Sequence, residues 1–345
     1  MYEMTRTERI KAALEFKPVD KVPVSVWMHY SGADQDPLTL AKAQVHIAEK
    51  YEHDFIKLMP FGLYGVQDWG TRIRITASRG EPPEVIEHAV HTAKDWAKLE
   101  VLPGMYGAYG NQVLLAQYVS RMTKGQIPFV QTIFSPLTTA RKMAGDRILI
   151  DMNENPQLLK QALQVITDTT INFVKENINA GVSGFFFATQ CCNDTYMSEE
   201  AYREFGIAFD SQVIEAYKDS TYFNIGHLHG ENGMFSLFDE LENNALNWHD
   251  RWCSPSMEEA RKITGKCLVG GIRECACCDS SKSAVLPSPL EEGNEEEIYL
   301  HVKELIDSAG KKGVILSPGC CASQFVGERQ LNALKTAVER LGGCS

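Results

Sequence analysis

Two histidines, His227 and His229, end an apolar segment, residues 222–229, that has the composition of a β-strand. Side chains two residues apart on a strand point to the same side, so both imidazoles can reach one metal ion. A second apolar segment, 313–317, leads into a pair of adjacent cysteines. Because zinc favours imidazole and thiolate ligands, we expect His227, His229 and Cys320 to hold zinc if the two segments end side by side. The alternative is that the histidines hydrogen-bond a substrate or loop without metal.

Only one of the adjacent cysteines, Cys320 and Cys321, is expected to face the histidines. Neighbouring side chains of an extended segment point in opposite directions. Cys320 follows Pro318 and Gly319, a turn signal that places it just beyond the strand. Cys320 is therefore the expected ligand, and an ordinary buried thiol is the alternative for either residue.

Eight short apolar segments alternate with helical patterns along the chain. Most are apolar on both faces, as buried parallel strands are. They are residues 22–30, 55–60, 129–134, 181–188, 222–229, 245–250, 267–272 and 313–317. The clearest helical patterns are residues 155–180, 198–218, 256–264, 295–310 and 328–341. This alternation predicts an α/β fold, a (β/α)8 TIM barrel formed by residues 1–345 as a single domain. A doubly wound sheet is the alternative, but no glycine-rich dinucleotide motif opens an early helix.

Two regions contain more residues than a minimal (β/α)8 barrel requires. Residues 61–125 are long for one crossover and contain an additional strand pattern at 71–77. We expect this excursion in the N-terminal half to cover part of the barrel mouth. Residues 273–296 combine three cysteines with serines, prolines and an acidic run, which predicts a mobile loop. Surface thiols are the expected role of those cysteines, Cys275, Cys277 and Cys278.

Function in such a barrel is located at the carboxyl ends of the strands. Catalytic roles are expected for His249 and Asp250, which could transfer a proton or orient a metal-bound histidine, and a structural hydrogen bond at the strand end is the alternative. Glu231 could orient His229 or act as a fourth ligand. Further residues at strand ends are expected to bind substrate, with ordinary packing as their alternative role: His29, Tyr30, Gln190, Cys191 and Arg273.

Charge and composition restrict the partners and the compartment. The net charge of −11 and the isoelectric point near 5.4 argue against nucleic acid and anionic membranes as partners. No run of eighteen uncharged apolar residues suggests a transmembrane helix, and the charged first ten residues do not resemble a signal peptide. Ten cysteines in such a chain are expected to be reduced thiols in a cytoplasmic protein that acts on a small molecule.

Two segments, 7–23 and 198–205, resemble the uroporphyrinogen decarboxylase superfamily of (β/α)8 barrels. True decarboxylases of this superfamily carry a Met-Arg-Gln-Ala-Gly-Arg motif after the first strand, and its arginines hold the acidic porphyrinogen. Residues 27–32 read Trp-Met-His-Tyr-Ser-Gly and contain no arginine. The resemblance therefore implies the other branch, the cobalamin-linked methyltransferases.

Members of that branch bind zinc through a His-x-Cys pair and a distant cysteine in a Gly-Cys-Gly turn. His227 and His229 correspond to the first motif, with His229 in place of cysteine, and Cys320 corresponds to the second. Because a neutral imidazole replaces a thiolate, the site would carry one less negative charge. The implied activity is zinc-dependent transfer of a methyl group between a corrinoid and a thiol or a methylated small molecule. The corrinoid would be methylcobalamin or a separate corrinoid protein.

Two other functions stay open at this point. The first is a metal-free decarboxylase or other lyase on a small carboxylic acid, with Arg273 and Lys57 as anchors of the carboxylate. The second is a non-enzymatic barrel that binds a corrinoid or another protein.

Overall fold

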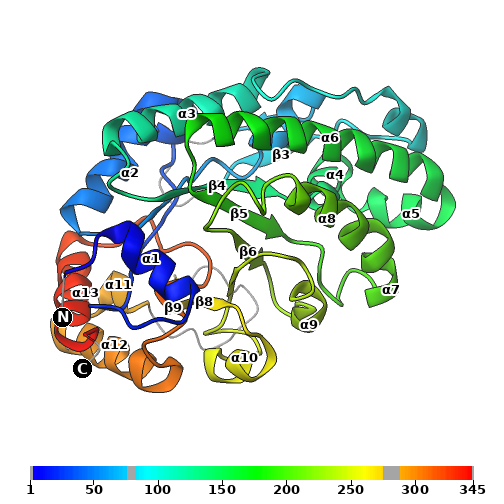
Figure 1. Cartoon of the computed structure of the whole chain (residues 1–345). Helices are drawn as coiled ribbons and strands as arrows, with labels where there is room; N and C mark the ends of the chain where they lie inside the picture. The colour runs from blue at the N-terminus through cyan, green and yellow to red at the C-terminus, as the bar shows by residue number, and fades with distance from the viewer. Residues whose placement is uncertain (1–2, 76–81, 275–287, 344–345) are drawn as a thin grey trace.

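The structure is a computed structural model, and it describes residues 3–75, 82–274 and 288–343. Seven parallel strands form one curved sheet in the order β1-β4-β5-β6-β7-β8-β9 (Figure 1). They are β1 (Ile56–Lys57), β4 (Phe129–Phe134), β5 (Gly184–Thr189), β6 (Ile225–Leu228), β7 (Ala245–Trp248), β8 (Cys267–Ile272) and β9 (Val314–Pro318). Neighbouring strands of this sheet are also consecutive along the chain, apart from β2 and β3 between β1 and β4, and crossovers connect them. The predicted barrel is therefore confirmed.

The barrel closes through residues 22–28, which lie between β9 and β1. This segment forms two isolated parallel bridges with the last part of the barrel, Val24 with Leu316 and Met28 with Ala322. The backbone N–H of Leu316 donates to the carbonyl of Pro23 over 2.8 Å. The segment thus occupies the place of the eighth strand.

The prediction of a regular strand over 22–30 is wrong, and the reason lies in the polar groups of the segment. Pro23 has no N–H to donate. The N–H of Val24 donates instead to the carboxylate of Asp54 over 2.8 Å, and the N–H of Asp54 donates to the Val24 carbonyl. A buried ion pair of 2.5 Å with Arg9 holds that carboxylate. A side chain therefore replaces part of the strand ladder.

Helices cover the outside of the sheet and connect its strands. The helical segments are α1 (Arg6–Leu14), η1 (Ala33–Gln35), α2 (Pro37–Lys50), η2 (Tyr64–Trp69), η3 (Ala93–Lys98), α3 (Gly107–Thr123), α4 (Pro136–Ala144), α5 (Arg147–Glu154), α6 (Pro156–Ala180), α7 (Glu199–Tyr202), η4 (Arg203–Ile207), α8 (Ala208–Glu215), α9 (Phe235–Phe238), α10 (Met257–Ile263), α11 (Pro289–Glu292), α12 (Glu295–Ala309) and α13 (Glu328–Leu341). The five predicted helices are present, and that predicted for 198–218 contains the π turn η4 between α7 and α8. No helix in the described residues is long and apolar enough to cross a membrane.

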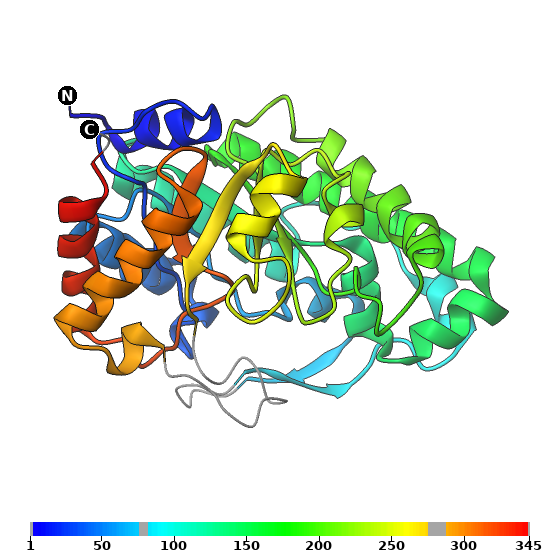
Figure 2. The same ribbon diagram turned by 90° about the horizontal axis from the view of Figure 1, so that it is seen from below.

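The excursion after β1 forms an antiparallel hairpin of β2 (Arg72–Arg74) and β3 (Glu84–Glu87). Figure 2 shows this hairpin on the side of the barrel toward which β8 points, where the strands end. The predicted position of the excursion at the barrel mouth is therefore confirmed. The loop predicted for 273–296 extends too far, because α11 and the start of α12 lie within it. Its three cysteines lie outside the described residues.

The barrel interior is filled by one cluster of buried side chains to which every barrel segment contributes. It includes Trp27, Phe55, Val130, Phe186, Ile225, Ala245, Val269 and Ile315. Close packing of this cluster fixes the strands relative to one another. The residues that follow the strands are therefore held in fixed positions at one end of this core.

Candidate metal centre and active-site pocket

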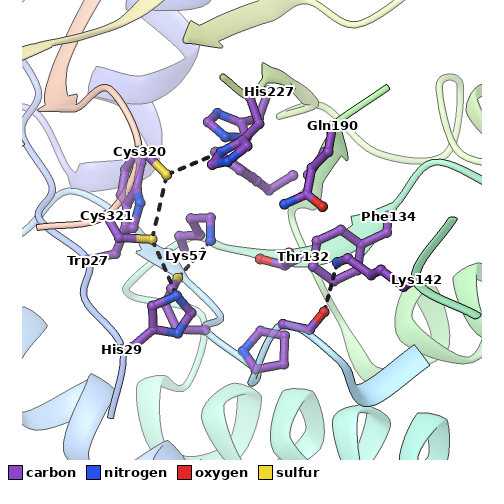
Figure 3. Close-up of a pocket in the computed structure, with 16 residues that line it drawn as sticks. Trp27, His29, Lys57, Thr132, Phe134, Lys142, Gln190, His227, Cys320 and Cys321 are labelled. Atoms are coloured by element: carbon purple, nitrogen blue, oxygen red, sulfur yellow. Dashed lines mark hydrogen bonds between the residues drawn. The ribbon is translucent and has the colours of Figure 1, made fainter. Parts of the chain in front are cut away.

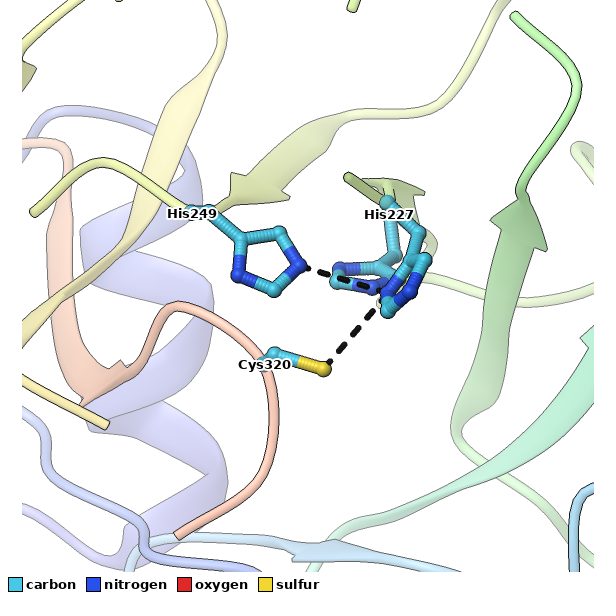
Figure 4. Close-up of side chains that lie close together, drawn as sticks. His227, His249 and Cys320 are labelled. Atoms are coloured by element: carbon cyan, nitrogen blue, oxygen red, sulfur yellow. Dashed lines mark hydrogen bonds between the residues drawn. The ribbon is translucent and has the colours of Figure 1, made fainter. Parts of the chain in front are cut away.

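Four side chains gather at the carboxyl ends of three barrel strands. His227 lies on β6 and His229 directly follows it, while His249 follows β7 and Cys320 follows β9. One donor atom from each of the four lies within 4.8 Å of the others. Figure 4 shows His227, His249 and Cys320 turned toward a common centre. The structure therefore brings the three predicted ligands together, and His249 joins them as a fourth potential donor.

Two distances among these donors match those expected around a tetrahedral zinc ion. His249 Nε2 lies 3.3 Å from His229 Nδ1, and Cys320 Sγ lies 3.7 Å from the same nitrogen. With Zn–N of about 2.05 Å and Zn–S of about 2.3 Å, a tetrahedron separates two nitrogens by about 3.3 Å and a nitrogen from a sulfur by about 3.6 Å. Three imidazoles and one thiolate are also ligand types that zinc accepts.

Asn247 fixes which nitrogen of His227 faces the centre. The Asn247 amide donates to the carbonyls of Val269 and Pro318 over 2.8 and 3.0 Å, so its oxygen is left to face the ring. That oxygen lies 2.6 Å from His227 Nδ1, which must therefore carry the proton and donate. His227 Nε2 is thereby unprotonated and available to a metal.

Glu274 orients His249 in the same way. Its Oε1 lies 2.5 Å from His249 Nδ1, and the carboxylate is fully buried. Its Oε2 has no hydrogen-bond partner among the described residues. Glycine is required at position 319, because an added Cβ would lie 2.7 Å from this oxygen and 2.5 Å from the Trp248 carbonyl. A carboxylate that orients a metal-binding imidazole is a recurrent feature of zinc sites.

Burial keeps the imidazoles of His227 and His229 neutral. It lowers the pKa of His227 well below its ordinary value, and the neighbouring histidines lower that pKa further. Burial, followed by the repulsion of His249, lowers the pKa of His229 to about 3. Because neutral imidazole is the form that binds a metal, these two residues are ready to coordinate at neutral pH.

A pocket of about 130 Å³ opens beside the four donors (Figure 3). Its wall includes His227, His229 and Cys320 together with two residues predicted to bind substrate, His29 and Gln190. A cavity of about 150 Å³ accommodates a molecule the size of benzene. The pocket therefore suits a small molecule and is far too small for a porphyrin or corrin ring.

Cys321 faces the same pocket, so both adjacent cysteines line it, contrary to the expectation of one. Its thiol lies 3.6 Å from His29 Nε2 and 4.0 Å from Cys320 Sγ. The Cys320 thiol, followed by the charges of His29 and Lys57, lowers the pKa of Cys321 well below its ordinary value. Because the segment after Pro318 turns and is not extended, the alternation expected of a strand does not apply.

Asp250 and Arg273, two residues predicted to act on substrate, lie outside the pocket wall. The Asp250 carboxylate accepts from the backbone N–H of Gly271 over 3.0 Å, and burial raises its pKa to about 7. The backbone of Arg273 is held by His301, whose Nε2 accepts from the Arg273 N–H over 3.3 Å. The structure thus does not bring Arg273 and Lys57 together as a pair of carboxylate anchors, and only Lys57 lines the pocket.

Three further predicted residues are neither among the four donors nor in the wall of this pocket. Glu231 has an exposed side chain, and its backbone carbonyl accepts from Asn193. Tyr30 lines a groove beside α2, where burial raises its pKa. Cys191 lines a separate groove next to α4, and burial raises the pKa of its thiol to about 11.

Sequence reasoning missed Glu274, Asn247 and Lys142. Asn247 precedes His249 by two residues on β7, so the alternation of a strand was a signal that could have placed both on one side. Glu274 follows β8 by two residues, which is a position where a barrel carries functional side chains. Lys142 lies on α4, and no strand pattern pointed to it.

The fold and the site together define a class: a (β/α)8 barrel with a His- and Cys-rich metal-type centre at the carboxyl ends of its strands. Residues 5–341 match the family described as uroporphyrinogen decarboxylase (URO-D). The chain belongs to this family.

Some relatives with low sequence identity to this chain carry names that state an activity. The chain is 21% identical to methylcobamide:CoM methyltransferase MtbA of Methanosarcina acetivorans, over 93% of each chain. It is 22% identical to methylcobamide:CoM methyltransferase MtaA of Methanosarcina barkeri, over 98% of each. A solved methyltransferase from Methanosarcina mazei covers 98% of this chain and 99% of its own, with a TM-score of 0.81 and 20% identity, and it shows the same fold.

Proposed function

We propose that this protein is a zinc-dependent methyltransferase that moves a methyl group between a corrinoid and a small thiol or methylated compound. The observation that carries the proposal is the set of four donors, His227, His229, His249 and Cys320, which lie within 4.8 Å of one another, and three of them, His227, His229 and Cys320, line a small pocket. Relatives that span nearly the whole chain are named methylcobamide:CoM methyltransferases, which supports the corrinoid as co-substrate.

The size of the pocket supports separate places for the two proposed substrates. About 130 Å³ holds the small substrate but not a corrin ring. The corrinoid, free or on a carrier protein, would therefore stay at the barrel mouth and present its methyl group to the pocket. In transfer to a thiol, the sulfur attacks the methyl carbon, the Co–C bond breaks with both electrons on cobalt, and the thiol proton is released.

Zinc held by these donors would bind a thiol as a fifth ligand or in place of one imidazole. It would keep that thiol deprotonated near neutral pH and leave it able to attack a methyl group. Asn247 and Glu274 keep the correct nitrogens of His227 and His249 free for the metal. With three neutral imidazoles and one thiolate, the loaded centre carries a net charge of +1. An anionic sulfur ligand would neutralise it.

The test combines metal analysis with methyl transfer. Purified protein should contain about one zinc per chain, and His227→Ala and Cys320→Ala should each lose it. Matched controls are His91→Ala, an exposed histidine, and Cys253→Ser, a cysteine that is not one of the four donors. The zinc-loaded protein should demethylate methylcobalamin in the presence of thiols, and the controls should behave as wild type.

Two outcomes would contradict the proposal. Folded wild-type protein that binds no metal would remove its physical basis. Full transfer activity in Cys320→Ala would show that the donor set has another role. Release of carbon dioxide from a small acid under strong chelation would instead favour a metal-free lyase.

A further inference from the structure

Two lysines, Lys57 and Lys142, line the pocket beside the metal centre, and the methyl transfer proposed above uses neither. Figure 3 shows them on opposite sides of the pocket. None of the described residues that line the pocket is an aspartate or a glutamate. An amine is a nucleophile once it has lost its proton, so the surroundings of each lysine decide what it can do.

Lys57 has only weak partners for a positive charge. The residue is 5% exposed, and its Nζ contacts the thioether sulfur of Met59 over 2.7 Å. The same Nζ lies 4.3 Å from the ring centre of Phe186 and 5.7 Å from that of Trp27. No carboxylate lies within ion-pair distance of it in the described part of the chain. Thioethers are weak acceptors and aromatic faces offset only part of the desolvation of a cation, so this site favours the neutral amine.

The protonation of Lys57 follows from this burial. Burial lowers the pKa of Lys57 to about 8, although the charges of Cys321 and Cys320 act to raise it. His29 and His227 also interact with its charge. At pH 7.5 roughly a quarter of such an amine is unprotonated, about 200 times the fraction of an ordinary lysine with a pKa near 10.4. A lysine that is desolvated in an apolar pocket is activated for attack on a carbonyl carbon.

Lys142 is better placed to supply a proton than to attack. Its Nζ donates to the backbone carbonyl of Gly62 over 2.8 Å and lies 3.3 Å from the ring centre of Phe134. This strong acceptor holds the amine against the wall, whereas Lys57 contacts only a thioether. Burial lowers the pKa of Lys142 to about 7, which suits proton transfer near neutral pH.

The pocket suits a small carbonyl compound. Its volume of about 130 Å³ is close to that which holds a molecule the size of benzene. Apolar side chains of Trp27, Met59, Phe134 and Phe186 form much of the wall around Lys57. Because such a wall restricts the access of water, it would protect an imine at Lys57 from hydrolysis.

We propose that Lys57 is a nucleophilic lysine that forms a Schiff base with a small aldehyde or ketone bound in this pocket. The unprotonated Nζ attacks the carbonyl carbon, and one of its own protons moves to the oxygen, which gives a carbinolamine. A proton from the Lys142 ammonium converts the hydroxyl group to water, which leaves as the nitrogen lone pair forms the C=N bond. The product is a protonated imine, and no oxidant or reductant is consumed. This activity goes beyond the proposed function, because neither a metal nor a corrinoid takes part.

The experiment traps the imine by reduction. Purified protein is incubated at pH 7.5 with acetaldehyde, acetone or pyruvate and sodium cyanoborohydride, which reduces a protonated imine to a stable secondary amine. Mass spectrometry of the digested protein then locates the adduct. Lys57 should be labelled at least about 10-fold faster than Lys98, an exposed lysine, because more of its amine is unprotonated.

Three variants test the assignment of roles. Lys57→Arg keeps the positive charge but cannot form an imine, so the fast adduct should disappear. Lys142→Met should slow the labelling while the adduct stays on Lys57. Lys98→Met, the matched control, should leave the labelling of Lys57 unchanged.

The pH dependence separates a buried nucleophile from general modification of lysines. The ratio of labelling at Lys57 to that at Lys98 should be constant below pH 8. It should fall above pH 8, because the unprotonated fraction of Lys57 then saturates while that of Lys98 still rises.

Two results would overturn the proposal. One is the absence of a fast adduct at Lys57 with all three carbonyl compounds, and the other is a fast adduct on Lys142 in its place. Both are measured on wild type, so poor folding of a variant could not hide them. The trapping needs neither zinc nor a corrinoid, so its outcome is independent of methyl transfer.

Discussion

Glu274 provides the sharpest test of how the barrel holds a metal. Its carboxylate is fully buried and accepts from His249 Nδ1 over 2.5 Å. In Glu274→Gln the amide oxygen can still accept this hydrogen bond, but the negative charge that makes the imidazole a better donor to metal is lost. Loss of such an orienting partner typically weakens metal affinity about 10- to 100-fold, or about 1.4–2.7 kcal/mol.

The assay is competition for zinc with a chelator of known affinity, followed by thermal unfolding with saturating zinc. The loss of binding free energy should appear as lower stability of the loaded protein, by about 2–5 °C in melting temperature. Glu328→Gln is the matched control, because that carboxylate is exposed and pairs with Lys50. Wild-type affinity in Glu274→Gln would refute the reasoning, as would an equal loss in the control.

Three further predictions follow from the described contacts. Lys57→Met should raise the melting temperature of the ligand-free protein, because it removes a buried ammonium that has no carboxylate partner among the described residues; a lower melting temperature would show that Met59 and the aromatic rings stabilise the charge fully. Gly184→Ala should lower the urea midpoint strongly, since an added Cβ would lie 1.8 Å from the Phe223 carbonyl, and a wild-type midpoint would contradict this packing. The pKa of Asp20 is lowered to about 2, where the hydrogen bonds and charge of Arg9 outweigh the opposing effect of burial. Its contribution to stability should therefore be present above its ordinary pKa near 3.8 and be lost as the pH falls toward 2. Urea unfolding of wild type and Asp20→Asn should show a difference that is constant above pH 4 and shrinks below it, and a difference that grows on acidification would be inconsistent with this sign.

Local patterns in the sequence were sufficient for the architecture. Short segments that are apolar on both faces predicted the parallel strands, because a strand buried on both sides has no polar face. The helices α6, α10, α12 and α13 followed from local helical patterns, such as the cap and proline, Asn155 and Pro156, at the start of α6. The segment 22–30 was not predictable as an irregular closure, since its ladder is interrupted by a carboxylate, that of Asp54, some thirty residues away in the chain.

The sequence by itself also determined the chemistry of the site. The alternation of a strand was enough to place His227 and His229 on one side, and the turn at Pro318–Gly319 pointed to Cys320, although it did not predict that Cys321 lines the same pocket. Only the tertiary structure decided which other residues meet them. His249 and Glu274 follow different strands. The closure of the barrel, which no local pattern encodes, brings His249 within 4.8 Å of the other donors and Glu274 within hydrogen-bond distance of His249. The same closure brings Lys57 of β1 and Lys142 of α4 to one small pocket, because residues far apart in the chain become neighbours only when all eight segments pack around one core.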